Sequence, residues 1–217
     1  MIHPEILIGV DESGKGDFFG PLVITAFLAP EKDTNKLKSL GVRDGKTLSV
    51  NRTHEIARAL KENFNYSTIV YFPEDYNNQY KIIKNLNKLL AEGHAEAISS
   101  LYNQHQADMA ISDKFGKPEH LEKALFKRKC TIELKQIVKG ETIIQVAAAS
   151  IIARSEFIEQ MDNLSEKYGF EIPRGASSIV DQAGIKFVDE QGLNSLNLVA
   201  KLHFKNYQRI IKPNLFA

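Results

Sequence analysis

A short apolar run near the start of the chain constrains the fold more than any other segment. Residues from Ile6 to Val10 are apolar or glycine without interruption, and the run stops at two acids, Asp11 and Glu12. A half-exposed strand alternates apolar and polar side chains, whereas a strand covered on both faces does not. This run therefore predicts a central strand in a sheet that carries helices on both sides.

A second strand is expected directly after the first. The apolar segment from Pro21 to Leu28 is separated from the first run by a glycine-bearing stretch, Ser13 to Gly20. Because this connection is too short for a helical crossover, the two strands are expected to be antiparallel. The sequence therefore predicts a hairpin with a glycine-rich loop.

Beyond this hairpin, segments of helical periodicity alternate with apolar segments of strand length. The expected helices cover residues 50–63, 78–105, 119–127, 146–168, 178–189 and 194–211. The expected strands cover residues 67–72, 107–112 and 131–138. This alternation predicts an α/β fold with a mixed β-sheet flanked by helices and a helical C-terminal region.

Length and composition set the broad class of the protein. The 217 residues contain no internal repeat or linker-like segment, so we expect a single domain over residues 1–217. The formal net charge is +1, from 28 basic and 27 acidic residues, so affinity for a polyanion must come from local patches. No apolar stretch has the length of a membrane span, and Cys130 is the only cysteine. We expect a monomeric cytoplasmic protein without disulfides, membrane anchor or signal peptide.

Three of the expected strands lead into an acid. Asp11 follows the first strand, Asp113 follows the strand at 107–112, and Glu141 comes shortly after the strand at 131–138. Reactive groups gather where strand ends and their loops meet in an open α/β sheet, so these acids are expected to converge. Taken singly, such an acid is more often a solvated turn residue or a helix cap.

Converging carboxylates repel one another, by roughly 3 kcal/mol for a pair about 5 Å apart at an effective dielectric constant of about 20. Two divalent cations would balance four such charges, and oxygen-only ligands suit Mg²⁺ or Mn²⁺. Two ions can also hold an attacking water and a leaving oxygen in line at a phosphodiester. Acids that converge in this way would therefore suit a two-metal site for phosphodiester hydrolysis.

The adjacent acids Asp11 and Glu12 raise a geometric difficulty. Successive side chains of a regular strand point to opposite faces, so we expect the strand to break at Glu12. Gly14, Gly16 and Gly20 permit such a departure and allow a ligand to approach the backbone closely. Their spacing matches neither the dinucleotide-binding fingerprint nor the Walker phosphate loop, and a plain hairpin explains the glycines alone equally well.

Several motifs resemble those of a known enzyme family. The segment from Gly9 to Pro21 resembles the opening active-site motif of ribonucleases HII and HIII, and its part from Asp17 to Pro21 resembles HIII specifically. Other segments resemble later motifs of the family in the same order: Asp44–Leu48, Gly93–Ala95, Ile111–Phe115, Lys139–Glu141, Val146–Arg154, Pro173–Ala176 and Lys201–Phe204. The chain thus resembles the type 2 ribonucleases H over nearly its whole length, and the ribonuclease HIII catalytic domain most of all.

This resemblance implies a ribonuclease H-like sheet and an endonuclease that cuts the RNA strand of an RNA/DNA hybrid duplex, leaving 5'-phosphate and 3'-hydroxyl ends. The implied cofactors are two Mg²⁺ or Mn²⁺ ions. The resemblance assigns both the catalytic and the metal-binding roles to Asp11, Glu12, Asp113 and Glu141.

The same resemblance assigns substrate contacts to the glycine loop and to one lysine. Gly14, Lys15 and Gly16 would recognise the 2'-hydroxyl groups of RNA through their backbone, and Lys46 would contact a phosphate. Lys15 stands where ribonuclease HIII usually has threonine, and Gly45 replaces the usual serine. We expect the protein to lack the N-terminal substrate-binding domain that ribonuclease HIII usually carries.

Basic residues near the end of the chain form a stripe on the expected helix at 194–211. They are Lys201, Lys205, Arg209 and Lys212. Such a stripe is more often a solvated face, but beside a hybrid-cleaving site it would bind phosphates, which makes Lys201 and Lys205 substrate-binding candidates. A lone histidine on a helix is usually packed or exposed, so no chemistry is assigned to His94, His105 or His203.

Three alternatives stay open. An enzyme of the ribonuclease HII kind would cut at single ribonucleotides in duplex DNA, whereas ribonuclease HIII prefers longer RNA runs. A sugar-kinase or actin-like ATPase also begins with a strand, an acid and a glycine turn, but this chain lacks a second glycine-rich phosphate loop. A non-catalytic hybrid-binding module is the third alternative, and the full set of acids argues against it.

Overall fold

The computed structural model describes residues 5–43 and 48–212. Contacts divide the described chain into two compact units. The first unit comprises residues 5–13, 23–43, 48–69 and 85–156, and the second comprises residues 14–22, 70–84 and 157–212. The expectation of a single domain over residues 1–217 stays a prediction.

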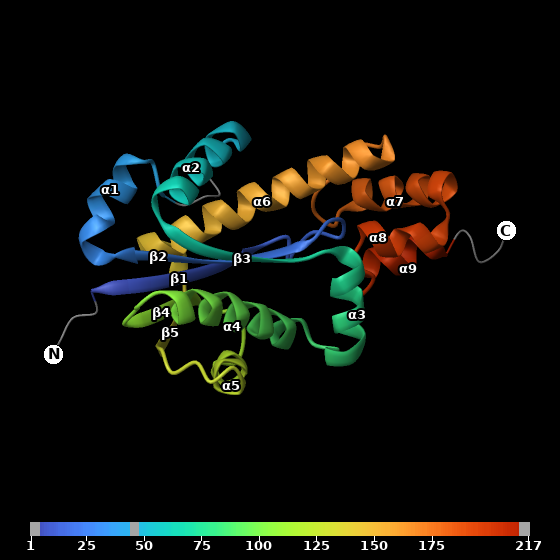
Figure 1. Cartoon of the computed structure of the whole chain (residues 1–217). Helices are drawn as coiled ribbons and strands as arrows, with labels where there is room; N and C mark the ends of the chain where they lie inside the picture. Colours follow the sequence, from blue (N-terminus) through green and yellow to red (C-terminus); the bar gives the residue numbers. More distant parts are fainter. Residues whose placement is uncertain (1–4, 44–47, 213–217) are drawn as a thin grey trace. The chain divides into compact units, whose positions relative to one another are not determined.

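The first unit is built on a five-stranded sheet in the order β3-β2-β1-β4-β5 (Figure 1). The strands are β1 (Ile6–Ser13), β2 (Leu22–Pro30), β3 (Asn65–Tyr71), β4 (Met109–Asp113) and β5 (Glu133–Ile137). β1 pairs antiparallel with β2 and parallel with β4, and β4 pairs parallel with β5. The predicted mixed sheet, its central first strand and the hairpin are therefore confirmed.

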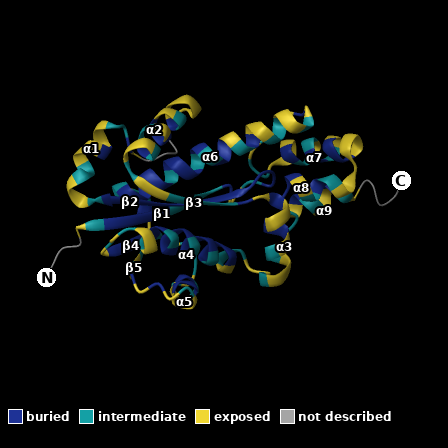
Figure 2. Cartoon of the chain, in the orientation of Figure 1, coloured by how far each residue is buried: buried dark blue, intermediate teal, exposed yellow. Residues whose placement is uncertain are grey.

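Helices cover both faces of this sheet. One face carries α1 (Thr34–Ser39), α2 (Val50–Asn63) and the first part of α6 (Ile144–Tyr168), and the other carries α4 (Leu86–Gln104) (Figure 1). Helix α5 (Glu119–Lys127) packs on α4. The central strands β1 and β2 are mostly buried, as Figure 2 shows. The uninterrupted apolar pattern of residues 6–10 thus follows from burial on both sides.

The second unit is mostly helical, which confirms the predicted helical C-terminal region. It contains α3 (Pro73–Ile83), the second part of α6, α7 (Ser178–Gln191), α8 (Leu196–Val199) and α9 (Lys205–Ile211). Short 3₁₀ turns occur in the chain at Glu31–Asp33, Gly140–Thr142 and Leu193–Ser195. Among the described residues, no helix has both the length and the apolar character needed to span a membrane.

The expected single helix at residues 78–105 is wrong. The chain forms two helices there, α3 and α4, because Lys84 adopts a left-handed conformation with φ of 50° and ends α3. Asn85 then begins α4 by accepting a hydrogen bond from the Lys88 backbone N–H.

The expected continuous helix at residues 194–211 is also wrong. After α8 the chain becomes extended at Ala200, which forms an isolated antiparallel bridge with Phe19. Backbone hydrogen bonds from Gly20 to Val199 and from Lys201 to Phe18 extend this pairing. The helix restarts only at Lys205, because residues 199–201 are used to hold another segment.

Candidate active site

The three strands that lead into the predicted acids run in the same direction. In the parallel register, Val10 of β1 lies beside Ser112 of β4, so Asp11 and Asp113 each follow at the same end of the sheet. Asp113 pairs in turn with Ile137, the last residue of β5, and Glu141 comes shortly afterwards in the 3₁₀ turn. The fold therefore brings these acids to one edge of the first unit.

Strand β1 does not break at Glu12, so this part of the prediction is wrong. The antiparallel ladder with β2 stays regular through Glu12, which pairs with Ile24, to Ser13, which pairs with Val23. A regular strand directs adjacent side chains to opposite faces. The contacts of Asp11 and Glu12 agree, because they involve helices on opposite faces of the sheet.

The Asp11 carboxyl lies on the α6 side. It accepts a hydrogen bond from the Ser150 hydroxyl and another, at 2.9 Å from Oδ1, from the Glu12 backbone N–H. Burial, together with the negative charge of Glu12, nevertheless raises the pKa of Asp11 to about 7. The protein by itself therefore disfavours the charged form of this acid at neutral pH.

The Glu12 carboxyl lies on the α4 side. Its Oε2 is 3.0 Å from Nε2 of His94, and Nδ1 of the same ring is 3.3 Å from the Ser112 hydroxyl. The His94 side chain is fully buried, and only 6% of the Glu12 side chain is exposed. His94 is thus a site residue that the sequence did not identify, because both partners lie far from it along the chain.

Asp113 is fixed by the turn that carries Glu141. Asp113 Oδ1 accepts a hydrogen bond of 2.9 Å from the backbone N–H of Gly140. Lys139, just before, adopts a left-handed conformation with φ of 59°, and the Lys114 N–H donates to the Ile137 carbonyl. These contacts fix the turn next to Asp113, and Glu141 follows as a half-buried residue.

The chemistry of these acids suits a hard cation. All four offer carboxylate oxygens, which Mg²⁺ and Mn²⁺ prefer, and the raised pKa of Asp11 marks a position where added positive charge would be stabilising. Within the described part of the chain, however, no three His, Cys, Asp or Glu side chains lie close enough together to hold one ion. Glu12 is engaged by His94 instead. The joint convergence of the acids on metal therefore stays a prediction.

The glycine loop after β1 belongs to the second unit. Gly14 is buried at φ of +85°, and a Cβ there would lie 2.2 Å from the Pro21 carbonyl oxygen and 2.9 Å from the Phe157 ring. Gly16 differs in every respect, since it is exposed, its φ is not positive, and a Cβ would meet nothing within 4 Å. Internal packing thus explains the glycine at position 14 but not the one at position 16.

The rest of this loop is held by the C-terminal part of the second unit. Asp17 Oδ1 accepts a 2.6 Å hydrogen bond from the Gly175 N–H, and the Phe18 N–H donates to the Gly175 carbonyl at 2.9 Å. Lys15 and Gly16 lie between these anchors and Gly14, and both are exposed. The exposed tip of the loop is therefore carried on a fixed base.

The comparison with protein families identifies the family of the chain. The model of the family described as ribonuclease HII matches residues 8–207, which include all four acids and the glycine loop. The chain belongs to the ribonuclease HII family. This membership confirms the resemblance and removes the sugar-kinase or actin-like ATPase alternative.

Relatives within the ribonuclease HII family are named ribonuclease HIII. The chain is 39% identical to that of Protochlamydia amoebophila and 40% identical to that of Chlamydia felis, in each case over 94% of this chain and 68% or 69% of the relative. A crystal structure of Bst-RNase HIII in complex with Mn²⁺ superposes with a TM-score of 0.91 at 31% identity. That comparison covers 98% of this chain and 71% of the other.

Lys201 does not belong to the predicted basic stripe. It precedes α9, its side chain is buried, and its ammonium donates to the carbonyls of Phe19, Gly20 and Pro21 at 3.2, 2.6 and 3.3 Å. An ammonium has three N–H donors, so none is left for a phosphate. The prediction that Lys201 contacts the substrate is therefore wrong.

The other predicted lysines and the stripe have different positions. Lys205 begins α9 and is exposed. Arg209, one turn later, is paired through Nε with Asp181 Oδ2 at 2.6 Å. Lys46 lies outside the described residues. Only Lys205 of the two candidates from the stripe thus stays a substrate-binding prediction.

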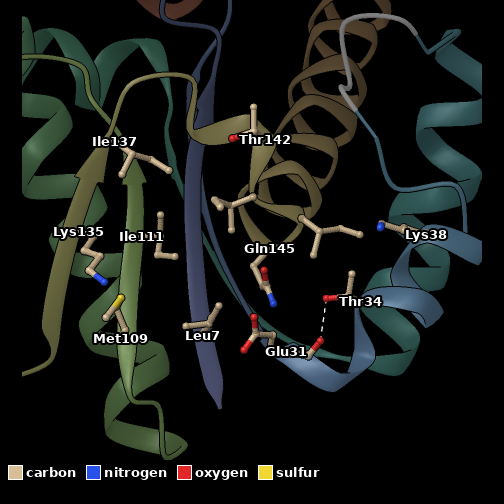
Figure 3. Close-up of a pocket in the computed structure, with 12 residues that line it drawn as sticks. Leu7, Glu31, Thr34, Lys38, Met109, Ile111, Lys135, Ile137, Thr142 and Gln145 are labelled. Atoms are coloured by element: carbon tan, nitrogen blue, oxygen red, sulfur yellow. Dashed lines mark hydrogen bonds between the residues drawn. The ribbon is translucent and has the colours of Figure 1, made fainter. Parts of the chain in front are cut away.

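A separate pocket of about 500 Å³ opens in the first unit (Figure 3). Apolar side chains of β1, β4 and β5 form much of it, including Leu7, Met109 and Ile137, with Lys38 and Lys135 also in its lining. None of the four acids lines it. This pocket is therefore not the predicted active site.

Proposed function

We propose that the protein is a metal-dependent endoribonuclease that hydrolyses the RNA strand of RNA/DNA hybrids. One observation carries the proposal: parallel pairing of β1, β4 and β5 brings Asp11, Asp113 and Glu141 to the same sheet edge in a chain of this family. The relatives named ribonuclease HIII, at 39% to 40% identity, support RNA as the target.

In this proposal two divalent cations, Mg²⁺ or Mn²⁺, are held by the four acids. When bound, they supply the positive charge that a phosphodiester needs for in-line attack by water, leaving 5'-phosphate and 3'-hydroxyl ends. Asp11 contributes a carboxyl whose pKa returns toward its ordinary value beside a cation. Asp113 is held by the Gly140 N–H, and Glu12 would have to exchange its contact with His94 for one with a cation.

The glycine loop selects the RNA strand. Gly16 is exposed with open space at its Cα, and the backbone of Gly14, Lys15 and Gly16 hydrogen-bonds the 2'-hydroxyls, which distinguish RNA from DNA. Lys15 is exposed on the same tip, and Lys205 is exposed at the start of α9. These two lysines and Lys46 contact phosphates, so binding weakens as salt rises.

The deciding experiment is cleavage of a duplex with a labelled RNA strand in Mg²⁺ and in Mn²⁺. Asp11→Asn is expected to lower the cleavage rate by at least about a thousandfold, since several kcal/mol of transition-state stabilisation depend on the cations. Asp189→Asn is the matched control, because Asp189 is exposed on α7. Full activity of Asp11→Asn, or equal cleavage of a DNA duplex by the wild type, would contradict the proposal.

The same assay separates the two substrate classes of the family. A duplex with one embedded ribonucleotide is compared with a hybrid that has a continuous RNA strand, in each metal. We expect faster cleavage of the continuous hybrid, because the relatives are named ribonuclease HIII. Preference for the single ribonucleotide would instead assign activity of the ribonuclease HII kind.

A further inference from the structure

The buried ammonium of Lys201 is a charged group that the proposed chemistry does not use. Its three acceptors are the carbonyls of consecutive residues, Phe19, Gly20 and Pro21, at 3.2, 2.6 and 3.3 Å. Three N–H donors therefore meet three carbonyl oxygens, and every donor is satisfied by one turn of the chain. Such a contact fixes the orientation of three successive peptide planes.

Packing alone does not account for a charge at this position. The Lys201 side chain is fully buried, and burial lowers its pKa to about 7, an effect that the negative charge of Asp17 partly offsets. The Tyr76 ring lies 5.9 Å away, and burial lowers the pKa of nearby His203 to about 4, so the imidazole is neutral. A methionine would fill similar volume without the cost of burying a cation.

The turn that Lys201 holds is in direct contact with the base of the glycine loop. The Pro21 carbonyl oxygen, an acceptor of the ammonium, is the atom that a Cβ at Gly14 would approach to 2.2 Å. Gly14 thus packs its Cα hydrogens against the same peptide group that Lys201 orients. The Lys201 N–H adds a 2.8 Å hydrogen bond to the Phe18 carbonyl. Loop and lysine form one connected backbone network.

We propose that Lys201 is a positioning residue for RNA recognition: its ammonium fixes the carbonyls of residues 19–21 and so holds Gly14–Gly16 in the geometry that reads a 2'-hydroxyl. This inference rests on the proposed function. Lys201 touches neither substrate nor metal, and it acts through the backbone of Pro21 and Gly14. Its removal is therefore expected to impair discrimination between RNA and DNA more than the capacity to hydrolyse a phosphodiester.

The test compares the wild type with Lys201→Met, each on hybrids with and without a given 2'-hydroxyl group. Hybrids are prepared in which each ribonucleotide near the cut is replaced singly by its 2'-deoxy counterpart, and kcat/KM is measured for each. At the most sensitive position the wild type is expected to lose about five- to tenfold, the value of one hydrogen bond. In Lys201→Met the same replacement is expected to cost less than about twofold.

Two controls exclude a general loss of structure. Lys81→Met replaces an exposed lysine of α3 in the same unit and is expected to keep the wild-type penalty. Should Lys201→Met not fold, judged by circular dichroism and thermal melting, the comparison is made with Lys201→Arg. A planar guanidinium keeps the charge but does not direct three donors at three consecutive carbonyls.

The outcomes separate this inference from the function on which it rests. A wild type that leaves hybrids intact overturns both. A wild type that cuts hybrids without a 2'-deoxy penalty, or a folded Lys201 variant that keeps the full penalty while losing overall activity, overturns the inference alone. The inference is supported if 2'-deoxy replacement lowers kcat/KM by less than about twofold in the folded variant. A merely structural role would lower activity on all substrates equally.

Discussion

The acid-bearing edge of the sheet and the glycine loop follow one another in the sequence, yet they are built by opposite means. At the sheet edge a regular backbone carries reactive side chains, and Asp11 is held close to Glu12 although their charges repel. In the loop the backbone itself is irregular, and distant residues such as Lys201 and Gly175 fix it. The proposed role of the sheet edge depends on charged side chains, and that of the loop depends on its backbone conformation.

This difference predicts opposite responses to substitution. Neutralising an acid removes a repulsion, so it stabilises the metal-free protein while it abolishes function. Filling the base of the loop creates a steric conflict, so it destabilises the protein. Active sites commonly carry such a cost in stability, and here the cost is confined to one of the two regions.

The largest effect on stability is expected for Gly14→Ala, at about 3 kcal/mol of lost unfolding free energy. The methyl group would collide with the Pro21 carbonyl and the Phe157 ring, and φ of +85° is itself strained for alanine. Gly169→Ala is the control, because Gly169 also has a positive φ, of +60°, but a Cβ there would meet nothing within 4 Å, and the change is expected to cost about 1 kcal/mol. Equal losses in urea denaturation would show that backbone conformation, not the close approach, fixes position 14.

A gain in stability is expected for Asp11→Asn without metal. The folded pKa of about 7 lies above the ordinary 3.8, so the folded state binds the proton more tightly and wild-type stability falls as pH rises between these values. At pH 8 in a chelator, the variant is expected to be more stable by about 1–3 kcal/mol. At pH 3.5 the difference is expected to shrink toward zero.

Denaturation at the two pH values measures this difference, and Asp189→Asn serves again as the exposed control. If Asp11→Asn proved less stable than the wild type at pH 8, the hydrogen bonds of the Asp11 carboxylate would outweigh its burial and its repulsion by Glu12. Adding Mg²⁺ to the wild type is expected to recover part of the lost stability, because a ligand that binds only the folded state stabilises it.

The smallest effect on stability is expected for Gly16→Ala, within about 0.5 kcal/mol of the wild type. Its Cβ would meet no protein atom within 4 Å, and its φ is not positive. The same methyl group would stand where the RNA backbone approaches, so KM for a hybrid is expected to rise several-fold. An unchanged KM would remove Gly16 from the proposed substrate contacts.

Much of the first unit could be predicted because its signals are local. The apolar pattern of residues 6–10 identifies a strand buried on both faces, and strands that run out into Asp113 and Glu141 identify the common edge. The helix at residues 78–105 could not be divided correctly, since the left-handed Lys84 and the cap at Asn85 interrupt a continuous periodic pattern by only two residues.

The roles of His94 and Lys201 could not be predicted, because they depend on contacts between distant parts of the chain. Spacing four residues from Lys205 suggested a helical stripe, whereas pairing of residues 199–201 with the loop turns Lys201 inward. Similarly, nothing around His94 in the sequence indicates Glu12, which lies 82 residues away. The periodicity of the sequence predicts helices and strands, but contacts between buried polar side chains can be identified only in the folded structure.

The contact between Lys201 and Gly20 joins residues 181 positions apart, and this has a consequence during synthesis. A ribosome makes the chain from the N-terminus, so the glycine loop is synthesised well before Lys201, which anchors it. A nascent chain that ends just before Lys201 already carries the four acids and Gly175, but it lacks the ammonium that holds the carbonyls of residues 19–21. In the proposed role of Lys201, selectivity for RNA is therefore acquired later in synthesis than the four acids.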